Sequence, residues 1–408
     1  MYVDIYSKAG KKDVDAFRDR LTRQCKALNV PLQFGPAPAG IAGGITVVFA
    51  RKSSKWTAAE ERALKQLMDE GRSILPVVPD PPSAQGLPKS LSAINAFIMR
   101  FFGNAWPECL ADETLSMTWL HRRTPKVFIS YKRTDSSPIA AQLYDRLNHL
   151  GYETFFDEAS VQRGADFQRE LKWWLNDADL LIVLASPRFP QSKWCMEEVT
   201  FCQQRFIGVA AIEWPREIYE GTSRVRFADL GNKAQRPVIL KRATPDQVMT
   251  LKLNDFAGRA IPRGGRDPKL PERELTEKAL ARVLAMCARQ RTVAIQQRLA
   301  DLIPLAQRLL PGATPIVGTT SPGDLAWSDT SGTKSFVRVL PFRPRPEHIR
   351  RACEDGVRHG TIGGCFYAEN DPYDPRAQSL RWLANATRPP DPLISDGHVW
   401  ASCGGVLL

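Results

Sequence analysis

Residues 179–199 read DLLIVLASPRFPQSKWCMEEV and decide the fold of the middle of the chain. The apolar run LLIVLA (180–185) is short and is bounded by polar residues and prolines, which is typical of a strand buried in a parallel sheet. The following segment carries Trp194 and Glu198 in a pattern that predicts a helix. A strand followed at once by a helix indicates an α/β unit in which helices cover a parallel sheet.

A second copy of this pattern lies near the N-terminus. The strand ITVVFA (45–50) precedes Ser54-Lys55-Trp56 and Glu60, and both copies spell SKW-x3-E. Upstream, the strands VDIY (3–6) and VFISY (127–131) each lead into an amphipathic helix that contains the triplet Asp-Arg-Leu. The offset between the copies grows from 126 residues (Asp19 against Asp145) to 138 residues (Trp56 against Trp194). The first copy therefore lacks 12 residues, in an interval where it holds the stretch GPAPAGIAGG.

We expect an α/β protein with two flavodoxin-like parallel sheets in tandem, followed by a C-terminal region of uncertain fold. In the first copy, the strand SILPVV (73–78), a Pro-rich turn, and a helix that aligns Ile94, Phe97, Ile98 and Phe101 should complete the unit. In the second copy, PVIL (237–240) should be the last strand, and a helix near 270–289 should follow it.

Beyond that point the periodic pattern fades. Residues 291–310 predict one further amphipathic helix, and after it only FVRVL (336–340) and HVWAS (398–402) predict strands. The predicted domain boundaries are 1–120, 121–290 and 291–408. By elimination, the last of these is the candidate for sensing or for binding an upstream partner.

The composition indicates a folded protein. Hydrophobic residues make up 43% of the chain and charged residues 25%, close to the averages for globular proteins. No apolar stretch approaches the ~20 residues that span a bilayer, and the first residues lack the apolar core of a secretory signal. We therefore expect a cytoplasmic enzyme or binding protein with no membrane partner. The eight cysteines and five histidines form no CxxC pair and no ligand-spaced cluster, so we expect reduced thiols and no metal.

The chain is basic, with 56 Lys and Arg against 44 Asp and Glu and a formal net charge of +12. Such a charge suits a polyanionic partner. The basic residues are interleaved with acids, however, and no Lys/Arg run with spaced aromatic residues is present. A solvated basic surface is therefore favoured over direct binding of nucleic acid.

Polar and aromatic residues follow three strands of the second copy, where ligands bind in parallel sheets of this kind. Trp194 and Glu198 are four residues apart and so lie on the same face of the predicted helix. A carboxylate beside an aromatic ring can hold ribose hydroxyls, or stabilise an oxocarbenium-like centre as a glycosidic bond breaks. The residues that follow the three strands are Ser130, Tyr131, Arg133 and Asp135; Asp157, Glu158, Arg163, Gly164 and Phe167; and Trp194 and Glu198.

The runs KVFISYKRTD, GYETFFDEASVQRGADF and DLLIVLASPRFPQSKWCMEEV resemble the motifs of a TIR (Toll/interleukin-1 receptor) domain over about 126–200. The resemblance implies cleavage of NAD between nicotinamide and ribose, with NAD as a substrate and no cofactor. The glutamate that catalytic TIR domains require lies four residues after the tryptophan of the last motif, which is Glu198. Glu197 is about 100° of helix away and is not favoured.

The resemblance also assigns substrate-binding positions, among which Phe167 stands where bacterial members commonly have Trp. The first copy resembles a decayed TIR domain, since it keeps Trp56 and Glu60 but lacks the flexible loop, and we predict that it is not catalytic. The positions that the resemblance assigns are Ser130, Arg133, Asp157, Arg163, Gly164 and Phe167. Tyr131 and Trp194, which follow the same strands, complete the predicted substrate-binding set.

Two functions remain open from the sequence. The first is an NAD glycohydrolase or cyclase activated by assembly, an activity that in prokaryotic relatives serves defence against phages. The second is a non-catalytic scaffold that forms a homo-oligomer or filament and docks on a partner such as an upstream sensor. In the second case, Trp194 is a packed core aromatic and Glu198 a solvated helix carboxylate.

Overall fold

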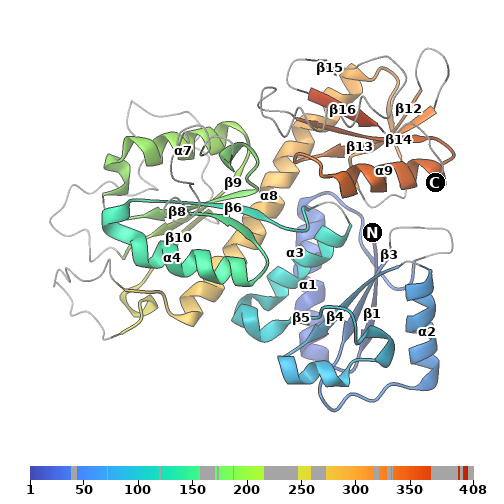
Figure 1. Ribbon diagram of the computed structural model, residues 1–408, viewed down its shortest axis with the longest axis horizontal. Coiled ribbons are helices and arrows are strands. Elements are labelled where there is room, and N and C mark those ends of the chain that lie inside the picture. Colours follow the sequence, from blue (N-terminus) through green and yellow to red (C-terminus); the bar gives the residue numbers. More distant parts are fainter. Residues whose placement is uncertain are drawn as a thin grey trace.

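The computed structural model of the chain describes residues 1–37, 44–70, 72–118, 121–156, 171, 174–186, 188–215, 247–258, 273–316, 321–328, 332, 334–368, 394–395 and 398–402. Three sheets lie within these residues. Each sheet and its helices make one lobe, and helix α8 (Glu277–Leu309) runs between the lobes (Figure 1).

The first sheet has five parallel strands in the order β2-β1-β3-β4-β5. Helix α2 begins with a capping box, in which Thr57 and Glu60 satisfy each other's backbone amides. Phe17 and Leu21 of α1 are fully buried with Val47 of the sheet, so α1 packs on the core through one face. The elements are β1 (Tyr2–Ser7), α1 (Lys11–Ala27), β2 (Gln33–Phe34), β3 (Gly44–Phe49), α2 (Ala58–Asp69), β4 (Ser73–Val78), β5 (Phe97–Ile98) and α3 (Trp106–Met117), with 3₁₀ helices at Pro81–Gly86, Lys89–Leu91 and Met99–Ala105.

The second sheet repeats this arrangement, with five parallel strands in the order β7-β6-β8-β9-β10. In both sheets the first strand of the chain lies between the second and the third, as in flavodoxin-like folds. The prediction of two such sheets in tandem is therefore confirmed. The elements are β6 (Lys126–Tyr131), α4 (Arg133–His149), β7 (Glu153–Phe155), β8 (Leu180–Ala185), α7 (Lys193–Gln204), β9 (Gly208–Glu213) and β10 (Val248–Thr250), with 3₁₀ helices at Phe189–Gln191 and Leu253–Asp255.

The helix predicted through Ile94 and Phe101 is wrong. The chain forms strand β5 and then a 3₁₀ helix, Met99–Ala105, that contains Gly103 at φ 53°, outside helical geometry. The α-helix begins only at Trp106, where Pro107 occupies a first-turn position that needs no backbone donor. The helical spacing of apolar residues that predicted a helix here is thus produced by a short strand followed by a 3₁₀ helix.

Two further predictions are corrected in the second half of the chain. The helices expected near 270–289 and over 291–310 are one continuous helix, α8, because neither Gly nor Pro interrupts the sequence between them and Arg291 is buried mid-helix. The boundary predicted at 290/291 falls inside this helix. Strand PVIL (237–240) lies outside the described residues, while β9 and β10, which the sequence analysis missed, fill the last two positions of the second sheet.

The third sheet is mixed, in the order β11-β12-β13-β14-β16-β15. Strands β13 and β14 are parallel and are joined by helix α9, and the other neighbours are antiparallel. Inside it, Arg338 is buried and donates to Asp324 at 2.7 and 2.8 Å and to Asp355 at 2.9 Å. Both predicted strands are present, as β13 and β16. The elements are β11 (Thr314–Pro315), β12 (Asp324–Ser328), β13 (Lys334–Leu340), α9 (Pro346–Arg358), β14 (Ile362–Ala368), β15 (Ile394–Ser395) and β16 (His398–Ser402).

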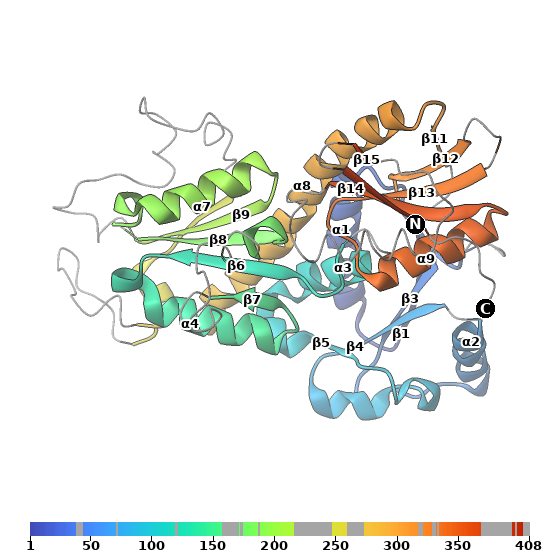
Figure 2. The same ribbon diagram turned by 45° about the horizontal axis from the view of Figure 1, so that its top comes forward.

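Helix α8 holds the three lobes together. It contacts α1 and α3 of the first lobe, β8 and β9 of the second, and β13 and β14 of the third, and it lies between them in a second view (Figure 2). Its Arg291 is fully buried, pairs with Asp112 of α3, and donates to the Arg122 carbonyl at 3.1 Å. Burial of a charge is tolerated only with such partners, so these contacts fix α8 in place.

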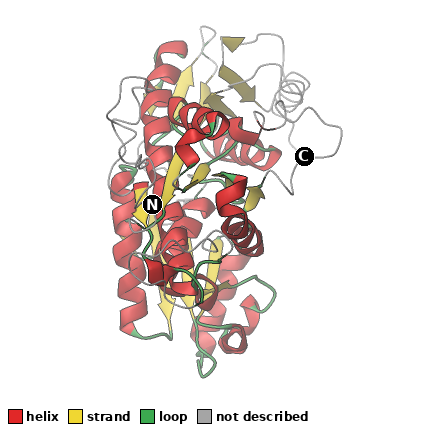
Figure 3. Ribbon diagram, turned by 90° about the vertical axis from the view of Figure 1, so that its left-hand side faces the viewer, coloured by secondary structure: helices red, strands yellow, loops and turns green. Residues whose placement is uncertain are grey.

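Helices flank the strands throughout the fold (Figure 3). Within the described residues, none of the helices combines the length and the apolar composition that crossing a bilayer requires.

Candidate functional site

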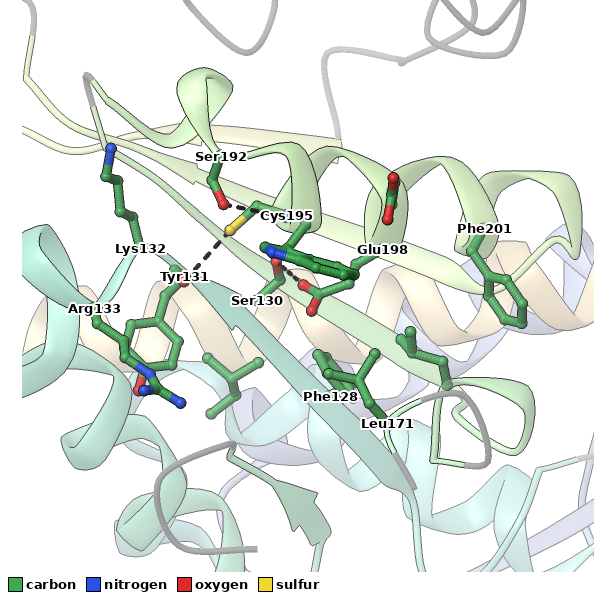
Figure 4. Close-up of a pocket in the computed structure, with 14 residues that line it drawn as sticks. Phe128, Ser130, Tyr131, Lys132, Arg133, Leu171, Ser192, Cys195, Glu198 and Phe201 are labelled. Atoms are coloured by element: carbon green, nitrogen blue, oxygen red, sulfur yellow. Dashed lines mark hydrogen bonds between the residues drawn. The ribbon is translucent and has the colours of Figure 1, made fainter. Parts of the chain in front are cut away.

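The carboxyl edge of the second sheet brings β6 and α7 together. Successive side chains of a strand alternate between its two faces, and Ser130 lies on the face of β6 that α7 covers. Ser130 is buried, and its Oγ donates to Oε2 of Glu198 at 2.5 Å (Figure 4). The two residues are 68 positions apart, and only the parallel fold makes them neighbours.

Glu197 and Glu198 differ in their surroundings. Glu198 is half-buried and is held by Ser130, whereas Glu197 is exposed and its carboxylate lies 3.7 Å from Lys193 Nζ on the same helix. Both line the same cavity. The carboxylate fixed by a short hydrogen bond is the one best placed to face a ligand there.

A cavity of about 390 Å³ opens in front of Glu198, a volume at the lower end of the range for small-molecule sites. Trp194 lines it and is 58% exposed, so it is not a packed core aromatic. The lining residues are Phe128, Ile129, Ser130, Tyr131, Lys132, Arg133, Leu171, Leu175, Ser192, Trp194, Cys195, Glu197, Glu198 and Phe201.

Tyr131 and Arg133 form one end of this cavity (Figure 4). The ring of Tyr131 is buried and stacks on Phe156, with the ring centroids 5.2 Å apart, because its side chain lies on the opposite face of β6 from Ser130. Its carbonyl accepts from Cys195 Sγ at 3.5 Å. Arg133 is exposed at the first residue of α4 and contributes a positive charge to the rim.

Asp135 lies behind this end of the pocket, in the first turn of α4, and does not line the cavity itself. It is buried in the first turn of α4, where Ser186 Oγ donates to it at 2.7 Å and Arg188 forms an ion pair with it. Ser186 and Arg188 follow strand β8, so Asp135 ties the loop after β8 to the start of α4. Negative charge near a helix N-terminus is stabilising.

Four of the predicted substrate-binding residues lie outside the described residues. They are Asp157, Arg163, Gly164 and Phe167. Their roles remain predictions.

The sequence analysis missed the apolar floor of the pocket. Phe128 points from β6 toward α7, and Leu171, Leu175 and Phe201 lie around it. The i, i+4 spacing of Leu171 and Leu175 is the signal that could have indicated a shared face. Lys132 and Ser192 also line the cavity, and neither was predicted from the sequence.

The same motif serves a different purpose in the first copy. There Glu60 accepts from the Thr57 amide at 2.8 Å as a helix cap, and its other oxygen lies 2.7 Å from Lys8 Nζ. Trp56 donates from Nε1 to the Gly86 carbonyl at 2.8 Å. Both motif residues are therefore committed to contacts that stabilise the first lobe.

Cys202 is not an activated nucleophile. It lies on the buried face of α7, where burial raises its pKa far above the ordinary value and the Glu198 charge raises it further. Among the described residues, no three or more His, Cys, Asp or Glu side chains gather where they could hold a metal ion.

Comparison with known proteins agrees with this geometry. Residues 127–238 match the model of the TIR domain family. The chain is 29% identical to TMV resistance protein N of Nicotiana glutinosa over 101 residues, which is 24% of this chain and 8% of that protein. It is also 29% identical to 2' cyclic ADP-D-ribose synthase BtTIR of Bacteroides thetaiotaomicron over 72 residues, which is 18% of this chain and 25% of that protein.

The chain thus spans only a small part of the curated relatives that it matches. The family match covers β6 from its second residue, strands β7, β8 and β9, and the whole of helix α7. Of these elements, β6 and α7 line the pocket. Residues 127–238 are a TIR domain.

Proposed function

We propose that the chain is an NAD glycohydrolase, acting by hydrolysis or by cyclisation, with Glu198 as its catalytic carboxylate. The observation that carries the proposal is the Ser130–Glu198 hydrogen bond at the mouth of a cavity of about 390 Å³. The similarity to a bacterial cyclic ADP-ribose synthase supports the choice of NAD as the substrate.

The chemistry follows from the carboxylate. The bond between the ribose carbon and the nicotinamide nitrogen breaks, and its electron pair leaves with the ring, which becomes a neutral base. The ribose carbon gains oxocarbenium character, and the negative charge of Glu198 stabilises it in a partly desolvated site. Addition of water gives ADP-ribose and releases a proton, whereas attack by a hydroxyl or ring nitrogen of the same molecule gives a cyclic product.

The lining of the cavity suggests how the dinucleotide lies. Phe128, Leu171 and Phe201 form an apolar floor suited to an aromatic leaving group. Lys132 and Arg133 at the rim carry the positive charge that a pyrophosphate needs. We place the nicotinamide riboside inside the cavity and the phosphates over these two cations.

A scaffold function is the alternative, favoured by the first lobe. It keeps a complete five-stranded parallel sheet, while Glu60 and Trp56 are tied into structural contacts. Such a lobe can still present helices and a sheet edge to a second copy or to a partner. Both functions are compatible with activation by assembly and with a role in antiphage defence.

The two functions are separated by product analysis and particle size. An enzyme releases nicotinamide from NAD, and release rises steeply with protein concentration where assembly is required. A scaffold forms larger particles in light scattering and leaves NAD intact at every concentration.

A further inference from the structure

The turn that ends the helix bearing Glu198 is held from outside the second sheet. Phe206, just beyond α7, has a φ of 52°, in the left-handed region that residues other than glycine rarely adopt. The Ile207 amide donates to the Cys202 carbonyl at 2.9 Å across this turn and closes the helix. The Phe206 carbonyl accepts from Nε of Arg298, on α8, at 3.0 Å.

The same guanidinium makes two further bonds. Its Nη2 donates to the Ala178 carbonyl, just before β8, at 3.2 Å. Its Nη1 donates to the Pro341 carbonyl, just after β13 of the third sheet, at 2.9 Å. The rigid fork of an arginine suits this arrangement, in which one side chain bonds three separate segments of backbone.

Neighbouring residues of the segment 341–345 touch the same edge of the second sheet. The guanidinium of Arg122 lies 5.2 Å from the centre of the Phe342 ring, and Arg122 also donates to Asp177 at 2.7 Å. Arg345 pairs with Glu153 at 2.8 Å. These contacts lie at the amino ends of the strands, so the third lobe docks on the edge opposite the pocket.

Helix α8 approaches this edge closely. A Cβ added to Gly208, the first residue of β9, would lie 2.9 Å from the Gln290 carbonyl of α8. This contact leaves α8 little room to shift against the second sheet, and Arg298 lies two turns further along the same helix.

We propose that Arg298 is a positioning residue that couples the third lobe to helix α7. Because α7 is a single helix of 12 residues, the position of its last turn sets the position of Glu198 in its first half. With Arg298 and Pro341 in contact, the turn at Phe206 is held and Glu198 stays aligned with Ser130. Withdrawal of the segment 341–345 removes one anchor of Arg298 and loosens the turn. The catalytic consequence rests on the proposed function, while the coupling itself does not.

Hydrogen–deuterium exchange of the full chain tests the coupling. Arg298→Lys keeps the charge but loses the fork, and amides of 196–207 should exchange about tenfold faster, while those of α4 stay unchanged. Arg345→Ala breaks the partly exposed ion pair between the segment 341–345 and Glu153 of the second sheet, and it leaves Arg298 unchanged. This variant should raise exchange in 196–207 about threefold. The matched control is Arg289→Ala, since Arg289 is on the same helix but faces Glu108 of the first lobe at 3.7 Å.

Unchanged exchange in 196–207 for folded Arg298→Lys would overturn the coupling, and so would an equal rise in the Arg289→Ala control. If Arg298→Lys does not fold, the exchange of 196–207 in Arg345→Ala is the test, and unchanged exchange there overturns the coupling. In NAD turnover with rates normalised to the concentration of folded protein, a positioning role lowers kcat about tenfold with KM within about twofold, whereas a general loss of folded protein leaves the normalised kcat unchanged. If the wild type releases no nicotinamide, the proposed function fails and the exchange result still stands.

Discussion

At the scale of single residues, the site depends on how two side chains from distant parts of the chain meet. Ser130 is buried and donates to Oε2 of Glu198 at 2.5 Å, which fixes the carboxylate beside the cavity that both residues line. A hydrogen bond to a charged group contributes about 1.5–3 kcal/mol. The orientation of the carboxylate therefore adds to the effect of its charge.

The first prediction concerns this bond. Ser130→Ala frees the carboxylate of Glu198 to rotate, and kcat for nicotinamide release should fall about tenfold or more while KM changes about twofold at most. The control is Thr200→Ala on α7, the helix of Glu198, where the hydroxyl donates to the Met196 carbonyl at 2.8 Å. A kcat for Ser130→Ala equal to that of the control would contradict the role of Ser130.

At the scale of elements, runs of apolar residues predicted several of the strands, because a buried strand needs little beyond an apolar run and a turn at each end. The fully buried strand β9 was nevertheless missed. Strands β4 and β8 have the bounds that SILPVV and LLIVLA predicted. Helical spacing was less informative, since the pattern through Ile94 and Phe101 came from β5 and a 3₁₀ helix. A period of three to four residues carries no information on which backbone geometry produces it.

The candidate site shows the same division. Glu198 and Ser130 followed from motifs that are local in sequence. The apolar floor of Phe128, Leu171, Leu175 and Phe201 instead needed the packing of three separate parts of the chain. The pairing of the third sheet was also beyond the sequence, because β14 lies between β13 and β16, and β16 comes from a distant part of the chain.

A prediction at this scale separates the two copies of the motif. Thr57→Ala removes the N-cap of α2 and should lower the free energy of unfolding of the first lobe by about 1 kcal/mol. Glu60→Gln should leave nicotinamide release unchanged, because Glu60 bonds Thr57 and Lys8 rather than facing a substrate. Denaturant unfolding and a turnover assay measure the two effects. Loss of turnover in Glu60→Gln would show that the first copy takes part in catalysis.

At the scale of the whole molecule, buried charges and histidines lie where the lobes meet. Burial lowers the pKa of His348, on α9, to about 3, and the positive charges of Arg122 and Arg345 lower it further. Burial likewise lowers the pKa of His121, although the neighbouring Asp112 raises it. Both histidines are therefore neutral in the folded protein at neutral pH.

The pH dependence of stability follows from these shifts. An unfolded histidine takes up a proton near pH 6.5, whereas folded His348 does so only near pH 3, so the free energy of unfolding should fall as pH drops through this window. The slope from one such group is at most about 1.4 kcal/mol per pH unit. His348→Gln should reduce the slope. Identical slopes in denaturant unfolding at pH 4–7 for His348→Gln and wild type would contradict the assignment.

Glu198 is the residue on which the proposed reaction depends most, and mass spectrometry of NAD-derived products tests its role. Wild type, Glu198→Gln and Glu197→Gln are incubated with NAD at concentrations where light scattering detects particles larger than the monomer. We predict nicotinamide together with ADP-ribose or its cyclic form for wild type and Glu197→Gln, and a loss of at least about a hundredfold for Glu198→Gln. Equal product from Glu198→Gln and wild type would contradict the central claim.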